Sequence, residues 1–259
     1  MSYINERKHR ELISVITPAY NAEKFIDSTI ESVLSQTYPE WEMIIVDDFS
    51  SDTTAEIVRE YALKDQRIKL IQLDVNSGPA ITRNTAIQNA RGRYLAFLDS
   101  DDQWLPEKLE RQLKYMQENK VGFSFTGYEY MDEQGNLSGK KETVPELVDY
   151  NALLKQNLIG CLTVMLDTEI TGQIEMINIR SRQDYTTWLN LTKRGINAHG
   201  IQEVLARYRV VQHSLSSNKL KMAKQNWRVY RDIEKLSFMK SVYYFMYYIF
   251  YKVKKYVLN

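Results

Sequence analysis

The sequence predicts an α/β fold with a mostly parallel β-sheet, helices on both of its faces, antiparallel additions in the second half and a C-terminal helical tail. The first observation is that strand-like and helix-like segments alternate four times within about the first 120 residues, a pattern typical of parallel sheets with crossover helices. The second is a hairpin turn and further strand-like segments in the second half, which favour antiparallel additions. The third is composition: of 259 residues, 44% are hydrophobic and 26% charged, as in ordinary globular domains.

Four predicted strands share one signature, a short apolar and β-branched run that ends in proline or polar residues. They span residues 12–17, 41–46, 68–73 and 94–98. Apolar residues at helical spacing predict a helix after each strand. Asn21 is a candidate cap for the first helix and residues 50–52 for the second, while Pro79 and Pro106 suit the first turns of the third and fourth.

The second half has a different pattern and is predicted to add antiparallel elements. We expect strands over 121–131, 162–166 and 201–211, helices over 153–158 and 185–193, and a hairpin turn over 133–136. No linker rich in proline, glycine or serine separates two free domains. We therefore expect one domain over 12–218, with halves at 12–102 and 103–218, and a separate tail over 219–259.

The predicted tail differs from the body in charge. Residues 219–259 hold 10 Lys and Arg against 2 Asp and Glu, whereas residues 1–218 hold 24 against 31. This asymmetry favours a local anionic partner over a nucleic acid. Seven aromatic residues between Tyr243 and Tyr251 suit a bilayer interface, although the ten-residue run 242–251 is too short to span it. The alternative is a helix docked on the domain or on a second subunit.

The N-terminus and the cysteine count limit the cellular setting. Residues 1–10 are polar and resemble no signal peptide, so we expect a cytoplasmic protein, peripheral on the inner face of the cell membrane. The single cysteine, Cys161, excludes an internal disulfide and a four-cysteine zinc site. Its apolar surroundings predict a small buried side chain.

Two acidic clusters follow predicted strands. Asp47 and Asp48 end the second strand, and residues 99–102 (DSDD) end the fourth. Carboxyl ends of parallel strands meet at one sheet edge, where ligands bind. Crowded carboxylates suit Mg²⁺ or Mn²⁺, although acids ahead of Pro106 also suit a helix N-terminus. Because the sequence has neither a dinucleotide fingerprint nor a P-loop, phosphate charge must be met by metal and by side chains such as Arg83.

Six ordered blocks together resemble glycosyltransferase family 2, whose members have the GT-A fold with its Rossmann-like sheet. They are PAYN at 18–21, SVLSQTY at 32–38, VDDFSSD at 46–52, NSGPAITRN at 76–84, FLDSDD at 97–102 and RQDYTTWL at 182–189. The resemblance covers about residues 12–216. It implies an inverting enzyme that transfers sugar from a nucleoside-diphosphate sugar, with UDP the usual nucleotide, to a saccharide or lipid-linked acceptor in bacterial surface polysaccharide synthesis such as capsule or teichuronic acid.

The resemblance also implies roles for individual residues. Residues 12–102 would bind the nucleotide sugar, and 103–218 the acceptor and the base. Asp184 matches the general base, and a divalent cation, Mn²⁺ or Mg²⁺, would bind at Asp101, Asp102 and His213. The implied nucleotide-binding residues are Thr17, Pro18, Ala19, Tyr20, Asp48, Gly78, Arg83, Asp99, Ser100 and Asp101.

Several alternatives stay open. Asp184 could instead cap the helix that holds Trp188, Trp188 could be core or a sugar platform, and His213 could be a surface residue. Residues 171–181 lack the glycine-rich stretch common in the family, which leaves acceptor recognition undefined. A nucleotidyltransferase would need a glycine-rich loop after the first strand, which is missing. A non-catalytic sugar-nucleotide-binding protein would lose the acidic cluster or the base, and both are present.

Overall fold

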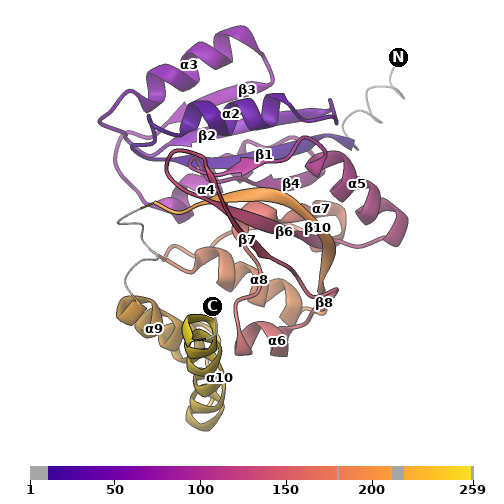
Figure 1. Cartoon of the computed structure of the whole chain (residues 1–259), viewed down its shortest axis with the longest axis vertical. Coiled ribbons are helices and arrows are strands. Elements are labelled where there is room, and N and C mark those ends of the chain that lie inside the picture. Colours follow the sequence, from indigo (N-terminus) through magenta and orange to yellow (C-terminus); the bar gives the residue numbers. More distant parts are fainter. Residues whose placement is uncertain (1–10, 180, 212–218, 258–259) are drawn as a thin grey trace.

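A single mixed sheet organises the computed structural model, which describes residues 11–179, 181–211 and 219–257 (Figure 1). Its strands follow the order β3-β2-β1-β4-β9-β6-β10-β5, with β7 beside β6 and β8 beside β10. The first four strands are parallel: β1 (Ile13–Ala19), β2 (Trp41–Asp47), β3 (Ile68–Gln72) and β4 (Tyr94–Phe97). The predicted α/β fold is confirmed, and these strands begin and end within two residues of the expected positions.

Helices cover both faces of the sheet. They are α2 (Ile26–Leu34), α3 (Thr54–Lys64), α4 (Pro79–Gln88) and α5 (Lys108–Asn119). Successive residues of a strand point to opposite faces, so Val15 and Ile45 belong to a core that contains residues of α2, α3 and α5. Ile16 and Val46 belong to a second core with residues of α4 and of α8 (Gln183–Lys193).

The second half adds antiparallel pairs and one parallel pair. Its strands are β5 (Gln103–Trp104), β6 (Phe123–Met131), β7 (Leu137–Glu142), β8 (Leu147–Val148), β9 (Met165–Asp167) and β10 (Ala198–Arg209). Its helices before α8 are α6 (Tyr150–Lys155), the 3₁₀ turn η1 (Cys161–Thr163) and α7 (Thr168–Thr171). The hairpin turn expected at 133–136 joins β6 to β7. Strand β9 is shorter than predicted because residues 161–163 form η1.

The C-terminal segment is helical, as expected, and packs on the domain. It comprises α9 (Lys219–Arg228), the π-helical turn η2 (Val229–Ile233) and α10 (Phe238–Val257). Val229 and Tyr230 are each 1% exposed and belong to the same core as α8. The Tyr230 hydroxyl donates to the Leu154 carbonyl over 2.6 Å, and Glu234 accepts from Tyr150. Residues 219–257 therefore share a core with 12–211.

Two helix starts differ from the predictions. Asn21 does not cap α2, whose N-cap is Phe25. Asn21 instead has a φ of 47° and its side chain accepts from the Ser51 amide, which ties the end of β1 to the loop after β2. Asp52 lies one residue ahead of the N-cap of α3 and accepts from the Thr54 amide over 3.0 Å. The sequence identified Asn21 and Asp52 as polar residues near helix starts, but contacts with other elements determine which groups they bind.

Candidate active site

One cavity of about 680 Å³ brings the two halves of the domain together. It lies beyond the carboxyl ends of β1 and β4, and its wall includes the first turn of α8, Met222 of α9 and Lys252 of α10. Seven residues predicted from the sequence line it: Tyr20, Arg83, Asp99, Ser100, Asp101, Asp102 and Asp184. The acidic cluster and the candidate base, 82 or more residues apart in the chain, therefore face one cavity.

The acidic loop 99–102 is held by two side chains from other elements. The Thr29 hydroxyl of α2 bonds to the carbonyls of Ser100 and Asp102, over 3.0 and 2.8 Å. From the end of β10, Arg209 donates its amide to Asp102 Oδ1 over 2.8 Å and its Nε to the Asp101 carbonyl over 2.7 Å. The loop is therefore fixed between the first helix and the last strand, so its carboxylates need little reorganisation to bind a ligand.

Burial and crowding make the carboxylates of this loop hard to ionise. Burial, and then the charge of Asp99, raises the pKa of Asp101 to about 6. Burial, reinforced by Asp101 and Asp99, also raises the pKa of Asp102 well above its ordinary value. Both groups would ionise more readily beside a cation.

The donor set fits a hard divalent cation. Asp101 and Asp102 both line the cavity. Among residues 11–179, 181–211 and 219–257, no three His, Cys, Asp or Glu side chains are arranged to hold a metal ion by themselves. Mg²⁺ is commonly held by one or two carboxylates together with substrate phosphates, and this loop offers that number. His213 lies outside the described residues.

Arg83 supplies a buried positive charge beside the acidic loop. It lies on α4, its side chain is 7% exposed, and its Nη2 donates to Asp99 Oδ1. Burial alone lowers the pKa of Arg83, but the charges of Asp99 and Asp184 outweigh it and raise the pKa. Its Nε and Nη1 are buried without a hydrogen-bond partner among the described residues. Two buried donors beside a cavity suit an anionic ligand.

Five of the predicted nucleotide-binding residues lie outside the wall of this cavity. Thr17, Pro18 and Ala19 belong to β1, and Gly78 precedes α4 with a φ of 86°, which favours glycine. The Asp48 carboxylate accepts from the amides of Ser77 and Gly78, over 2.7 and 2.9 Å. In this structure Asp48 thus holds the turn before α4, and its contact with a nucleoside stays a prediction.

Asp184 lies in the first turn of α8 and does not act as its cap. The N-cap is Arg182, with a left-handed φ of 73°. None of the hydrogen bonds within the described part of the chain involves the Asp184 carboxylate, which is half-buried in the cavity wall. The cap interpretation is therefore wrong, and the carboxylate is available to a substrate. Trp188 is fully buried between Phe97 and Phe123, a core residue rather than a sugar platform.

Sequence reasoning missed three contributors to the site. Arg209 belongs to none of the sequence motifs, and only the tertiary structure shows that it contacts the acidic loop. Met222 and Lys252 come from the segment that the sequence assigned to a separate tail. Cys161, expected to be a small buried residue, is 8% exposed and also lines the cavity, and burial raises the pKa of its thiol.

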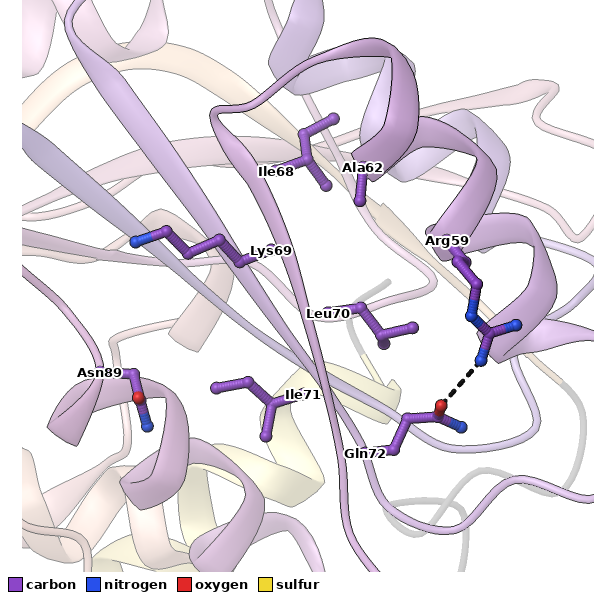
Figure 2. A pocket seen from close by; sticks show the side chains of 8 residues that line it. All are labelled: Arg59, Ala62, Ile68, Lys69, Leu70, Ile71, Gln72 and Asn89. Atoms are coloured by element: carbon purple, nitrogen blue, oxygen red, sulfur yellow. Dashed lines mark hydrogen bonds between the residues drawn. The ribbon is translucent and has the colours of Figure 1, made fainter.

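A second cavity lies on the edge of the sheet. It has a volume of about 560 Å³ and is lined by β3, by Arg59 and Ala62 of α3, and by Asn89 (Figure 2). Arg59 Nη2 donates to Gln72 Oε1 over 2.8 Å. The residues that line it include no carboxylate. We therefore take the first cavity as the candidate active site.

The fold and the cavity are those of a glycosyltransferase that uses a nucleotide sugar. The comparison with known families agrees. Residues 14–169 match the model of glycosyl transferase family 2. The chain belongs to this family. Asp184 lies beyond the matched residues, so its assignment depends on the cavity and on the resemblance of residues 182–189.

Two curated relatives match nearly the whole chain. The Bacillus subtilis protein TuaG, assigned to teichuronic acid biosynthesis as a glycosyltransferase, is 53% identical over 95% of this chain and 98% of its own length. The Escherichia coli protein WfgD, named a UDP-Glc:α-D-GlcNAc-diphosphoundecaprenol β-1,3-glucosyltransferase, is 39% identical over 96% of both chains. The resemblance to bacterial surface-polysaccharide glycosyltransferases is therefore confirmed.

Solved structures show the same fold at lower identity. Staphylococcus aureus TarS 1–349 in complex with UDP has a TM-score of 0.66 and 23% identity, over 85% of this chain and 65% of that one. The mannosyltransferase PcManGT from Pyrobaculum calidifontis, solved with GDP-Man and Mn²⁺, has a TM-score of 0.66 and 19% identity, over 87% and 64%. This chain thus spans about two thirds of the solved chains, and the likeness confirms the GT-A fold.

Proposed function

We propose that this family 2 enzyme is an inverting, metal-dependent glycosyltransferase that moves a sugar from a UDP-sugar to a lipid-linked saccharide during bacterial surface polysaccharide synthesis. The observation that carries the proposal is the single cavity that joins the acidic loop, Arg83 and Asp184. The UDP complex of TarS and the UDP-Glc donor of WfgD support the nucleotide.

The donor would bind at the strand ends. Tyr20 is 53% exposed at the cavity wall and offers a ring to the nucleoside, while Asp99 and Ser100 offer oxygens to the ribose. Arg83 would meet the diphosphate with its two unpartnered donors. Asp101 and Asp102 would hold the divalent cation, which supplies positive charge against the charge that develops on the leaving diphosphate.

Asp184 would act as the general base for the acceptor. Its carboxylate would take the proton from the acceptor hydroxyl while the hydroxyl oxygen attacks the anomeric carbon and the bond to the diphosphate breaks. A single displacement inverts the configuration at that carbon. The other carboxylates of the cavity wall have other roles: Asp99 pairs with Arg83, Glu142 accepts from the Tyr130 hydroxyl, and Asp101 and Asp102 are assigned to the cation. A single displacement needs no carboxylate as a nucleophile.

The acceptor would be presented at a membrane through α10. Phe238, Met239, Tyr243, Met246, Ile249, Phe250 and Val253 are exposed large hydrophobic residues, and most recur at helical spacing along one stripe. The helix has no Asp or Glu, and Lys240 and Lys254 are exposed beside the stripe. No helix of the described chain is long and apolar enough to cross a bilayer. Such a helix suits an anionic bilayer surface, and the protein would be cytoplasmic and peripheral.

Two assays test the proposal. Purified protein with UDP-glucose, UDP-N-acetylglucosamine and other UDP-sugars should release UDP in the presence of Mn²⁺ or Mg²⁺ and an acceptor, and lose this activity with a chelator. The protein should also sediment with anionic vesicles but less with neutral ones, and less as salt rises. UDP binding without transfer to any acceptor would favour the non-catalytic alternative. Sedimentation that is equal with both kinds of vesicle would contradict the membrane contact.

A further inference from the structure

The wall of the cavity around Asp184 contains polar side-chain atoms that have no hydrogen-bond partner within the described part of the chain. Arg182 Nε is buried, and no group among residues 11–179, 181–211 and 219–257 bonds to it. The same holds for Oε1 of Gln183, a residue that is only 7% exposed. Both residues line the cavity directly ahead of Asp184. Buried polar atoms in folded proteins are nearly always paired. Two unpaired atoms in adjacent residues of one cavity wall point to a ligand that supplies the partners.

The backbone at this place is also constrained. Arg182 is the N-cap of α8 and has a φ of 73°, a left-handed conformation that is costly for a residue with a side chain. Non-glycine residues in this region tend to occur at functional sites. Here the conformation ends the preceding loop and places Arg182 at the positive end of the α8 dipole, which favours anions.

Positive charge converges on this wall from two distant segments. The ring of Tyr248 on α10 lies 6.0 Å from Arg182 Cζ and 5.9 Å from Lys252 Nζ. The two cations are therefore within about 12 Å of each other, and both line the cavity. Tyr248 is 8% exposed and stacks on Phe245, so the ring that carries this arrangement is itself held in place.

We infer that Arg182 and Lys252 form a second phosphate-binding site, which takes the diphosphate of the acceptor, and that Gln183 binds the acceptor sugar. The inference depends on the proposed function. In a sugar linked to lipid through a diphosphate, the phosphates are attached to the same ring that carries the attacking hydroxyl. When that hydroxyl is at Asp184, a diphosphate on the same ring lies within reach of Arg182, two residues earlier.

This arrangement selects a class of acceptor. A diphosphate one sugar ring away from the base fits a monosaccharide on a lipid diphosphate, whereas a longer saccharide would carry its phosphates beyond the Arg182 and Lys252 wall. Lys252 lies on α10, whose exposed stripe provides the apolar surface next to which the lipid would emerge. The enzyme would then act directly after the reaction that attaches the first sugar phosphate to the lipid phosphate.

The test compares two detergent-solubilised acceptors that share N-acetylglucosamine and one short alkyl chain. In one the sugar is linked through a diphosphate, and in the other it is a simple glycoside. Wild type should strongly prefer the diphosphate. Arg182→Gln and Lys252→Gln should each raise KM for the diphosphate acceptor about 10–100-fold, the usual worth of one charged hydrogen bond, while KM for the glycoside stays unchanged. Arg182→Lys should recover part of the affinity.

Lys224→Gln is the matched control, because Lys224 is exposed on α9 and does not line the cavity. It should behave like wild type with both acceptors. Equal KM for the two acceptors in wild type, or equal losses for both acceptors in the variants, would overturn the inference. Calorimetry of UDP binding distinguishes failure of the proposed function from failure of the second phosphate site. If neither the wild type nor the variants bind UDP, the proposed function fails. If all of them bind UDP but do not discriminate between the two acceptors, only the second phosphate site is rejected.

Discussion

The two ends of the cavity are built in different ways. At the proposed donor end, Arg83 and the acidic loop come from consecutive β-α units within residues 79–102, and parallel pairing of β1 with β4 places the acidic loop beside the end of β1. At the proposed acceptor end, Arg182 is the N-cap of α8, Met222 lies on α9 and Lys252 lies on α10. The positions of the residues at the first end follow from the order of the strands, and those at the second end follow from how the helices pack.

This difference affects how each end can change. A ligand site at strand ends is held by the ladder of the sheet and by buried pairs such as Arg83 with Asp99. A site between helices is held by side-chain packing, which tolerates rearrangement at constant volume. The donor end should therefore be robust to mutation of the C-terminal helices, and the acceptor end should not.

The largest expected effect is on the reacting group. Asp184→Asn should keep donor binding and lower turnover by about 10²–10⁴-fold, the range for a general base, because the amide cannot take the acceptor proton. Turnover measured with saturating UDP-sugar, beside calorimetric UDP affinity, checks this. Asp149→Asn is a suitable control, since Asp149 caps α6 through the Ala152 amide and Asn caps almost as well. Near-normal turnover in Asp184→Asn would remove Asp184 from the mechanism.

The second prediction concerns the stability that the C-terminal helices give to the acceptor end. Tyr230→Ala should lower the free energy of unfolding by about 3–5 kcal/mol, as for other large buried aromatics, because it empties a core site and frees the Leu154 carbonyl. Tyr243→Ala, at a side chain 51% exposed, should cost less than about 0.5 kcal/mol. Urea unfolding of both variants measures the difference. Similar values for the two would mean that the helices are a detachable tail, as the sequence suggested.

Away from the cavity, helix α5 carries an unusual buried lysine. Lys108 on α5 is fully buried, lies 4.0 Å from the ring of Trp104 and donates to Gln112 Oε1. Burial lowers the pKa of Lys108 to about 7 from its ordinary 10.5. Between these two values the unfolded chain binds a proton that the folded chain has released, so stability should rise with pH across this window and be level below it.

Lys108→Met should remove that dependence. The variant should be more stable than wild type by a few kcal/mol at pH 7 and below, and the gain should shrink as the pH approaches 10.5, where a neutral lysine no longer costs free energy in either state. Urea unfolding at several pH values checks the sign. A wild-type stability that stays level between pH 7 and 10 would show that Lys108 keeps its proton in the core.

The smallest effect is expected at the donor end from Arg209, which positions the acidic loop from outside it. Arg209→Lys removes the Nε bond to the Asp101 carbonyl, which is the side-chain contact with the acidic loop, but keeps the amide bond to Asp102. It also removes the guanidinium bonds to the carbonyls of Asp132 and Glu133 and to Ser28 Oγ. We expect UDP affinity in the presence of Mn²⁺ to fall about tenfold, the effect of one to two hydrogen bonds. Arg207→Lys is the control, because Arg207 lies on the same strand as Arg209 but pairs with Glu129 of β6 and not with the acidic loop. Equal affinity in both variants would show that Thr29 alone holds the loop.

The sequence located the part of the cavity wall at the strand ends much better than the part formed by the helices, for a physical reason. Strands β1 to β4 are short apolar runs whose periodicity is local, and the acidic loop follows one of them directly, so pattern alone located Asp99–Asp102. Arg182 and Lys252 are 70 residues apart, and only the packing of Tyr248 brings them together. The charge count of residues 219–259 was correct, but it could not tell that Tyr230 is buried in the catalytic core.

Asp48 illustrates a second limit. Its type and its position after β2 suggested a ligand contact, yet its carboxylate accepts from two backbone amides of the following turn. A sequence cannot distinguish a carboxylate that holds a loop from one that faces a cavity, since both occur at strand ends. Lys108 is the opposite case: charged residues in a helix are expected on the surface, and only the fold shows that this one is buried.

The exposed stripe of α10 has a consequence for how the enzyme would find its acceptor. A helix that rests on a bilayer by one face fixes the rotation of the rigid domain packed against it, so the cavity keeps a constant height and direction above the lipid plane. Encounter with a lipid-linked sugar then becomes lateral diffusion in two dimensions, and the effective acceptor concentration depends on its density in the leaflet rather than in the cell volume. Acceptor levels that are dilute by volume would still saturate an enzyme confined to that plane.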